Sequence, residues 1–257
     1  MTARIARIRR HPIKSLSGED VGRTTLSAAR PLPGDRHWAL LTEAGEAHAG
    51  PDPRPGRWLP KSCFLRGAAE AALQAIEGGW GDDPDPAPGV PVTLRHPDQP
   101  PLCFDPATEG GRLVEWVSPL WPAERPRPTR LVAGPTAWTD VNRPWISILS
   151  QASLADLETR LGRPLGIARW RANLWVEGWP AWAERDLVGQ VLTVGTAELR
   201  VTEPIGRCPA TSADSRTGRI DIDMPEALKA LFGNSDFGIY AEVVTGGTIA
   251  VGDRIGP

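Results

Sequence analysis

Short runs of alternating apolar and polar residues, separated by turn residues, constrain the fold of this chain more than any other feature. Residues 4–9 read Arg-Ile-Ala-Arg-Ile-Arg, and residues 197–202 read Ala-Glu-Leu-Arg-Val-Thr. Such period-two runs are typical of strands that bury one face. Strands and helices do not alternate regularly along the chain, which argues against a doubly wound sheet. The pattern predicts a mainly β, α+β fold with a few short helices.

Three segments carry the signals of helices. Residues 151–161 follow Ser150, a residue type that caps helix N-termini, and end before Gly162. Residues 225–232 begin with a proline and end before a glycine, the usual asymmetry of a helix. Residues 67–76 are rich in alanine and also predict a helix.

Proline and glycine cluster between residues 119 and 144, and we place an interdomain linker there. The predicted domains are residues 1–118 and residues 145–257. In the second domain, residues 240–245 and 248–251 flank a Gly-Gly pair and predict a closing hairpin. A chain of 257 residues is long enough for both domains to bury a core.

Charge and hydropathy limit the partners of this chain. A net charge of −2 provides no general attraction to nucleic acid or to an anionic membrane surface. No window approaches the roughly 20 apolar residues that a membrane helix needs, and the basic N-terminus has no apolar run of secretory length behind it. We therefore expect a cytoplasmic protein that acts without nucleic acid or membrane. Any anion binding must come from locally placed lysines and arginines.

The common catalytic motifs are missing from the sequence. The three cysteines, Cys63, Cys103 and Cys208, are widely spaced and match no disulfide framework, zinc pattern or iron–sulfur run. Neither a phosphate-binding P-loop nor a dinucleotide fingerprint occurs. All four histidines lie in the first half of the chain, and no Ser-His-Asp elbow sequence is found.

One cysteine nevertheless has an unusual context. The stretch Glu203–Asp214 places Cys208 between Arg207 and a proline, followed by small residues and a carboxylate. A thiolate is a soft metal ligand and a strong nucleophile, and positive charge nearby favours it. The same cysteine also fits a small buried core residue, the common state of a free cysteine. The stretch alone leaves both interpretations open.

Six short motifs, in this order, resemble the MOSC proteins with an N-terminal β-barrel domain. They are Pro12–Ser15, Gly34–Arg36, Leu149–Leu157, Arg171–Asn173, Arg207–Cys208 and Phe237–Tyr240. This molybdenum cofactor sulfurase C-terminal-like superfamily includes the mitochondrial amidoxime-reducing component. Each motif is weak alone, but together they cover nearly the whole chain. The resemblance implies an N-terminal β-barrel-like domain followed by a MOSC β-barrel domain.

The resemblance also implies a bound molybdenum–molybdopterin cofactor. Cys208 matches the cysteine whose sulfur coordinates molybdenum. The matching cofactor contacts are Lys14, Ser15 and Arg36 in the first half and Ser150, Arg171, Asn173, Arg207 and Tyr240 in the second half. These residue types suit the ligand, because a phosphate favours lysine, arginine and hydroxyl donors and a soft metal favours a thiolate.

The function that the resemblance implies is a molybdenum-dependent oxidoreductase. It would remove oxygen from N-hydroxylated or related N- or S-oxide substrates, with Cys208 as metal ligand. Asp214 or Asp35 would deliver protons, although a turn-capping role fits either residue equally well. We expect no iron–sulfur cluster and no pyridoxal phosphate in this chain. Electrons would therefore come from a separate donor protein, either ferredoxin-like or haem-containing.

Two other functions remain open at this point. Cys208 would carry a persulfide in a sulfur-carrier protein, or the chain would store or deliver the cofactor without turnover. The sequence also departs from the family pattern: Ala172 stands where relatives often have proline, and Pro209 removes one backbone N–H beside the metal ligand. Residues 47–66 match the family poorly, so the resemblance does not define the substrate.

Overall fold

The computed structural model describes residues 2–16, 18–81 and 89–257 of the chain. Eight of the strands in this part form one sheet, in the order β17-β11-β12-β15-β9-β10-β1-β2. Their bounds are β1 (Arg4–Arg10), β2 (Glu19–Val21), β9 (Ile146–Ser150), β10 (Leu174–Glu177), β11 (Val191–Val194), β12 (Ala197–Gly206), β15 (Asp236–Thr245) and β17 (Ile255–Gly256). The mainly β fold is confirmed.

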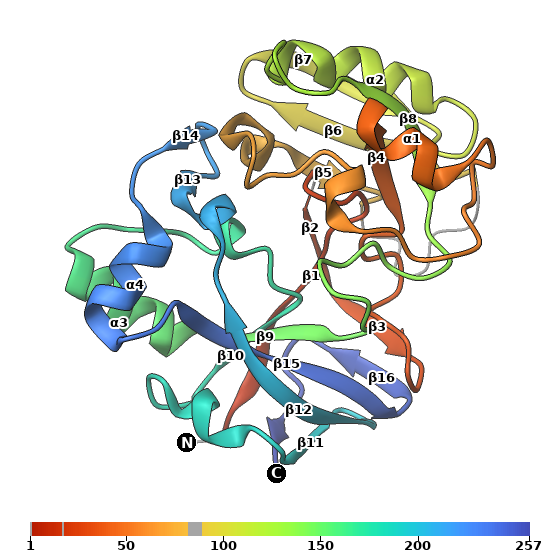
Figure 1. Ribbon diagram of the computed structural model, residues 1–257. Helices are drawn as coiled ribbons and strands as arrows, with labels where there is room; N and C mark the ends of the chain where they lie inside the picture. The colour runs from red at the N-terminus through yellow and green to blue at the C-terminus, as the bar shows by residue number, and fades with distance from the viewer. Residues whose placement is uncertain (1, 17, 82–88) are drawn as a thin grey trace.

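The large sheet closes on itself beside its last strand. Ile5 N donates to Asp253 O at 2.9 Å, and Gly252 N donates to Ile5 O at 2.8 Å. These bonds join β1 to the segment that leads into β17, and they give the sheet a barrel-like form (Figure 1). Buried side chains such as Ile148 and Leu199 fill its interior.

Smaller sheets form the other part of the molecule, drawn above the barrel in Figure 1. Here β4 (Trp38–Thr42) pairs with β8 (Pro128–Ala133), and β5 (Glu77–Gly79), β6 (Val92–His96) and β7 (Gln99–Phe104) form a second sheet. The helices α1 (Glu43–Ala49) and α2 (Gly110–Val117) accompany them. Leu40, Leu94 and Leu113 belong to one buried cluster that is separate from the barrel core.

Strand pairing crosses between the two halves of the chain. β1 pairs with β10, and β3 (Arg23–Leu26) pairs with β16 (Gly247–Ala250). β8 lies inside the predicted linker 119–144, so part of that segment belongs to a sheet of the first half. Residues 4–26 thus contribute strands to the sheets of the second half. The predicted domain bounds stay a prediction.

The predicted closing hairpin near the C-terminus is wrong. β16 takes β3 as its antiparallel partner, with Thr248 opposite Thr25, and β15 pairs with β9 and β12. A Gly-Gly turn allows the chain to reverse, but it does not determine which strand the following residues will pair with.

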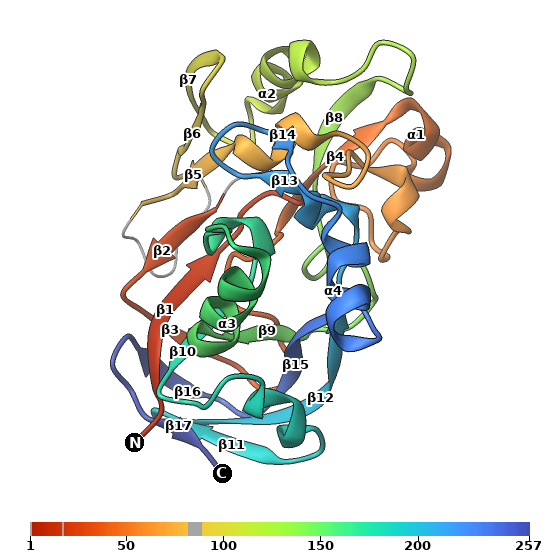
Figure 2. The same cartoon turned by 90° about the vertical axis from the view of Figure 1, so that its left-hand side faces the viewer.

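Two of the three predicted helices are confirmed, α3 (Gln151–Leu161) and α4 (Met224–Phe232), which share a buried cluster (Figure 2). The third prediction is wrong, because residues 67–76 contain only the 3₁₀ helix η2 (Ala71–Ala75). Three consecutive residues at its end are buried, whereas a surface α-helix buries one stripe. In the described part of the chain, no helix combines the length and apolarity needed to cross a membrane.

Candidate cofactor-binding site

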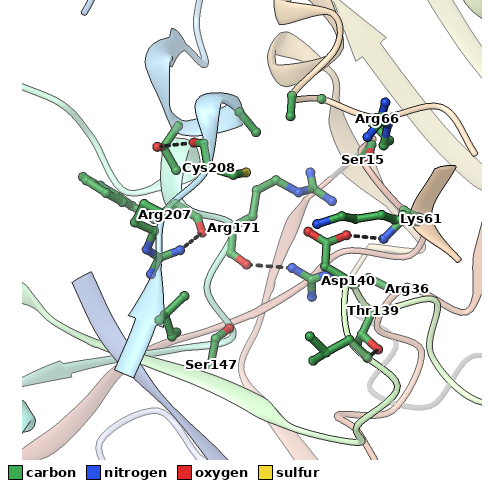
Figure 3. Close-up of a pocket in the computed structure, with 18 of the residues that line it drawn as sticks. Ser15, Arg36, Lys61, Arg66, Thr139, Asp140, Ser147, Arg171, Arg207 and Cys208 are labelled. Carbon is green, nitrogen blue, oxygen red and sulfur yellow. Dashed lines mark hydrogen bonds and ion pairs between the residues drawn. The ribbon is translucent and has the colours of Figure 1, made fainter. Parts of the chain in front are cut away.

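A cavity of about 190 Å³ lies where loops of the first half meet the barrel (Figure 3). The first half contributes Lys14, Ser15, Arg36, Lys61, Arg66, Gly67, Ala68 and Gln74. The second half contributes, among others, Asp140, Arg143, Trp145, Ser147, Arg169, Trp170, Arg171, Asn173, Arg207, Cys208, Thr211 and Tyr240. Neither half forms the cavity alone.

The cavity wall is strongly cationic. Among the described residues that line it, eight are lysine or arginine and one, Asp140, is a carboxylate. A concave site lined by one sign of charge concentrates the field of those charges and attracts ligands of opposite sign. The cavity therefore fits an anionic ligand, although the chain as a whole is slightly acidic.

Cys208 lies on this wall with its side chain exposed, so its interpretation as a buried core residue is wrong. It lies two residues after the end of β12 and directly before the 3₁₀ helix η6 (Pro209–Ser212). Thr211 fixes this turn, because its backbone N and its Oγ1 donate to Cys208 O at 3.0 and 2.8 Å. Figure 3 shows the Cys208 sulfur facing the space into which Arg171 and Lys61 also point. Of the other cysteines, Cys63 is buried and Cys103 is exposed elsewhere.

Arg36 is held by a buried carboxylate. Asp35 accepts from His11 N at 2.8 Å and from His11 Nδ1 at 3.1 Å, and its other oxygen accepts from Arg36 Nη1. Burial opposes the charge on Asp35, but the Arg36 guanidinium and His11 hold its pKa well below the usual range. A carboxylate that stays ionised does not donate protons at neutral pH. The geometry therefore supports Asp35 as an anchor for Arg36 rather than as the predicted proton donor.

Lys14 is buried and bonded on two sides. Its Nζ donates to Asp140 Oδ1 at 2.5 Å and to Trp138 O at 2.9 Å. Burial lowers the pKa of Lys14, and the Asp140 carboxylate offsets part of that effect. Asp140 is therefore the anion that balances Lys14 in this structure.

Arg171 connects the two halves of the chain. Its Nη2 donates to Leu16 O at 3.0 Å, and its own carbonyl accepts from Arg36 Nη2 at 2.9 Å. Burial and the nearby Arg36 charge lower the pKa of Arg171 to about 9. The guanidinium remains charged at neutral pH, but its surroundings would stabilise it further if an anion were bound.

The Arg207 side chain bonds to backbone carbonyls rather than to its neighbour Cys208. Its guanidinium donates to Phe237 O at 2.8 Å and to Trp170 O at 3.1 Å, and lies over the Trp170 ring. Burial lowers the pKa of Arg207 to about 10, although Tyr240 and Cys208 favour its charge. Arg207 is therefore fixed in the wall by carbonyl oxygens.

Backbone strain concentrates at this cavity. Five described residues other than glycine have a positive φ, and three of them are the predicted cofactor contacts Ser15 (64°), Arg36 (49°) and Arg171 (50°). Side chains other than glycine rarely adopt this conformation, and holding one there costs about 1–3 kcal/mol. Such strain tends to gather at functional sites, where the surrounding structure maintains it.

The structure brings together most of the predicted site residues. Lys14, Ser15, Arg36, Arg171, Asn173, Arg207, Cys208 and Tyr240 all line the cavity. The Asn173 amide is already engaged, accepting from Ser147 Oγ at 2.9 Å and donating to Arg9 O at 3.2 Å. Burial raises the pKa of Tyr240, so its hydroxyl stays protonated. Their roles toward a ligand stay predictions.

Two predicted residues lie outside the cavity lining. Ser150 is fully buried, and its hydroxyl accepts from Ser153 N to cap α3. Asp214, in β13 (Ala213–Asp214), pairs with the exposed Arg216 near β14 (Arg219–Ile220). Ser147 lies on the same strand as Ser150. Residues three apart on a strand face opposite sides, so Ser147 lines the cavity and Ser150 does not.

Several lining residues were not predicted from the sequence, among them Lys61, Arg66, Gln74, Asp140 and Ser147. No local motif marks them. Gln74 stands out because it is 5% exposed and its Nε2 is buried without a hydrogen-bond partner in the described structure. An unsatisfied buried polar atom costs about 1–3 kcal/mol.

A family model of the MOSC domain matches residues 139–256, the part of the chain that carries Cys208, Arg171 and Tyr240. The second half of this chain is a MOSC domain. Along 98% of its length the MOSC-domain chain is 27% identical to mitochondrial amidoxime-reducing component 1 of Mus musculus, covering 81% of that relative. Over 122 residues it is 36% identical to mitochondrial amidoxime reducing component 2 of Bos taurus, a match that spans 43% of this chain and 36% of the relative.

The human component 1 shows a similar partial match, 35% identity over 120 residues, or 35% of its length. Two solved structures also align with the MOSC-domain protein. YiiM from Geobacillus stearothermophilus covers 43% of this chain and 52% of its own at 24% identity, with a TM-score of 0.35. The YUAD protein from Bacillus subtilis covers 99% of this chain and 94% of its own at 14% identity, with a TM-score of 0.44.

Proposed function

We propose that this MOSC-domain protein is a molybdenum-cofactor-dependent oxidoreductase that reduces N-hydroxylated or related N- or S-oxide substrates. The observation that carries the proposal is the exposed Cys208 thiol on a wall shared with eight lysine and arginine side chains and one carboxylate. The relatives named amidoxime-reducing components support the choice of substrate class.

The residues of the cavity fit the chemistry of a molybdopterin-type group. Lys14, Arg36 and Arg171 present an ammonium and two guanidiniums for a phosphate. Cys208 presents a soft sulfur ligand for the metal. Burial and the Arg36 charge lower the pKa of Arg171 to about 9, so a bound anion would favour its charged form. When bound, the cofactor would supply a metal centre that changes oxidation state.

Reduction of an N-hydroxylated substrate consumes two electrons and two protons. The N–O bond breaks, an N–H bond replaces it, and the oxygen leaves as water. We propose that a separate ferredoxin-like or haem protein supplies the electrons. The protein's own groups would position the substrate and exclude bulk water. Asp214 pairs with Arg216 outside the cavity lining, so it is not placed to donate a proton to a substrate in the cavity.

Metal analysis tests the proposal directly. We expect stoichiometric molybdenum and pterin in protein purified from a host that makes the cofactor, and activity toward an arylamidoxime with a chemically reduced dye as electron donor. Cys208→Ala should lose this activity and its metal ligation. Cys103→Ala is the matched control, because Cys103 is also exposed but lies outside the cavity lining. Wild-type protein without molybdenum and without amidoxime reduction would overturn the proposal.

Sulfur transfer is the second candidate function, favoured by the same exposed thiol. The Cys208 thiolate would take the outer sulfur of a donor persulfide, releasing the donor thiol and leaving a Cys208 persulfide. Cyanide-labile sulfur that is present in molybdenum-free wild-type protein and absent from Cys208→Ala would establish this function.

A further inference from the structure

Gln74 contributes a buried amide group to the cavity wall. Its side chain lines the cavity, 5% of the residue is exposed, and Nε2 has no hydrogen-bond partner within the described structure. A core position would favour an apolar residue over an unsatisfied amide. The cavity is where a ligand could supply the missing acceptor.

The neighbouring Gly67 leaves room for this amide. A Cβ built on Gly67 would lie 1.7 Å from Gln74 Nε2, closer than atoms can approach. Its backbone does not fall in the left-handed region, so packing against the amide accounts for the glycine. Gly67 and Gln74 thus form one packed unit in the cavity wall, with the amide nitrogen buried against the glycine.

This unit lies near the Cys208 side of the cavity. η2, which contains Gln74, contacts η6, and η6 begins directly after Cys208. η2 also packs closely against the turn between β13 and β14, because a Cβ on Gly218 would lie 2.8 Å from Ala72 Cα. The amide therefore lines the cavity from a segment packed against the Cys208 turn.

Two cations from the same half of the chain share this region. Lys61 and Arg66 line the cavity, and Figure 3 shows Lys61 extending into the space that the Cys208 sulfur faces. Neither residue belongs to the motifs matched to cofactor contacts. An amide N–H, an ammonium and a guanidinium together favour an oxyanion, since each donates hydrogen bonds and two carry positive charge.

We propose that Gln74, Lys61 and Arg66 form a substrate subsite for a carboxylate, so that the preferred substrates are small N-hydroxylated molecules that carry a carboxylate near the reduced group. This proposal rests on the proposed function. Gln74 Nε2 donates to the carboxylate, and the two cations balance its charge.

Paired substrates test the subsite. One is an arylamidoxime and the other is the same molecule with a ring carboxylate. In Gln74→Met, we expect KM for the carboxylate-bearing substrate to rise about 10- to 100-fold, the range for losing a hydrogen bond to a charged group. KM for the neutral substrate should change less than about twofold. Gly67→Ala, which displaces the amide, should show the same pattern, and Gln190→Met, at an exposed position, should show none.

A second measurement avoids turnover. Calorimetry of the cofactor-loaded protein with the carboxylate-bearing amidine product should show the same 10- to 100-fold loss in Gln74→Met, on the same reasoning. Molybdenum content and the midpoint of thermal unfolding should stay at the wild-type level or above. Equal loss for both substrates, unchanged binding, or a lowered unfolding midpoint would overturn the subsite.

The two proposals fail in different ways. Amidoxime reduction without a Gln74-dependent preference for the carboxylate overturns the subsite and leaves the proposed function. A molybdenum-free protein that still binds the carboxylate-bearing probe through Gln74 supports the subsite as a binding site and overturns the proposed function.

Discussion

Arg36 and Arg171 both line the cavity and are joined by a hydrogen bond, but their charges are balanced in different ways. Arg36 and Arg171 have almost the same backbone conformation, with φ of 49° and 50°. Arg36 pairs with the buried Asp35, and that carboxylate raises the pKa of Arg36 although burial opposes it. Arg171 donates to carbonyl oxygens such as Leu16 O, and burial lowers its pKa to about 9.

This difference distinguishes a charge that is balanced within the protein, on Arg36, from a charge that is available to bind a ligand, on Arg171. The Asp35 carboxylate balances the Arg36 guanidinium within the protein itself. Burial lowers the pKa of Arg171 and of Arg207, and the nearby acidic groups offset only part of that effect. An anion bound in the cavity would therefore gain most from the Arg171 wall.

The largest expected effect comes from breaking the ion pair between Arg36 and Asp35. Asp35→Asn should lower the free energy of unfolding of the cofactor-free protein by about 3–5 kcal/mol, because it leaves the Arg36 charge buried without its partner. Glu242→Gln is the control, since it breaks the exposed pair with Arg200 and should cost less than about 1 kcal/mol. Urea denaturation measures both, and equal losses would show that the Arg36 wall does not depend on its buried pair.

Replacing Arg171 should have a smaller effect, and the effect should be on anion binding rather than on stability. Arg171→Met should weaken phosphate binding to the cofactor-free protein about 10- to 100-fold, because a hydrogen bond to a charged group contributes about 1.5–3 kcal/mol. Its unfolding free energy should change little, since methionine fills similar space without a desolvated charge. Calorimetry with inorganic phosphate measures the first effect and urea denaturation the second. Arg216→Met, at an exposed position, should bind phosphate like wild type.

The smallest expected effect concerns pH. Burial and the charges of Arg171 and Arg36 hold the pKa of His11 well below its usual 6.5, against the pull of Asp35. Below pH 6.5, His11 binds a proton in the unfolded chain but stays neutral in the folded protein until a lower pH. The stability due to neutral His11 is therefore complete above pH 6.5 and falls as the pH drops below it, by up to about 1.4 kcal/mol per pH unit.

Replacing this histidine should flatten the acid side of the stability curve. His11→Gln should lose less stability between pH 6.5 and pH 5 than wild type does, measured as unfolding free energy in urea at each pH. His48→Gln, at an exposed position, controls for loss of a histidine. If the slopes of wild type and His11→Gln coincide, the charge balance around Asp35 differs from the one described.

Much of the fold could be predicted from local sequence. The alternation in residues 4–9 predicted β1, and the caps of residues 151–161 predicted α3 to the residue. The alanine-rich residues 67–76 led to a wrong prediction of an α-helix. Burial of Leu73, Gln74 and Ala75 favoured a 3₁₀ turn although the residues have high helix propensity. Ser150 was predicted in two roles, and the structure supports the helix cap.

The sequence by itself determined the strand periodicity, the capped helices and the motifs that contain Lys14, Arg36, Arg171 and Cys208. These features depend on near neighbours and on residue type, which a single chain displays directly. The pairing of β16 with β3, the closure of the barrel by β1, the exposure of Cys208 and the unsatisfied amide of Gln74 were decided only by the tertiary structure. Each of them depends on contacts or solvent access set by distant segments of the chain. Hydrophobic burial brings those segments together, but it is non-directional and does not specify which segments meet.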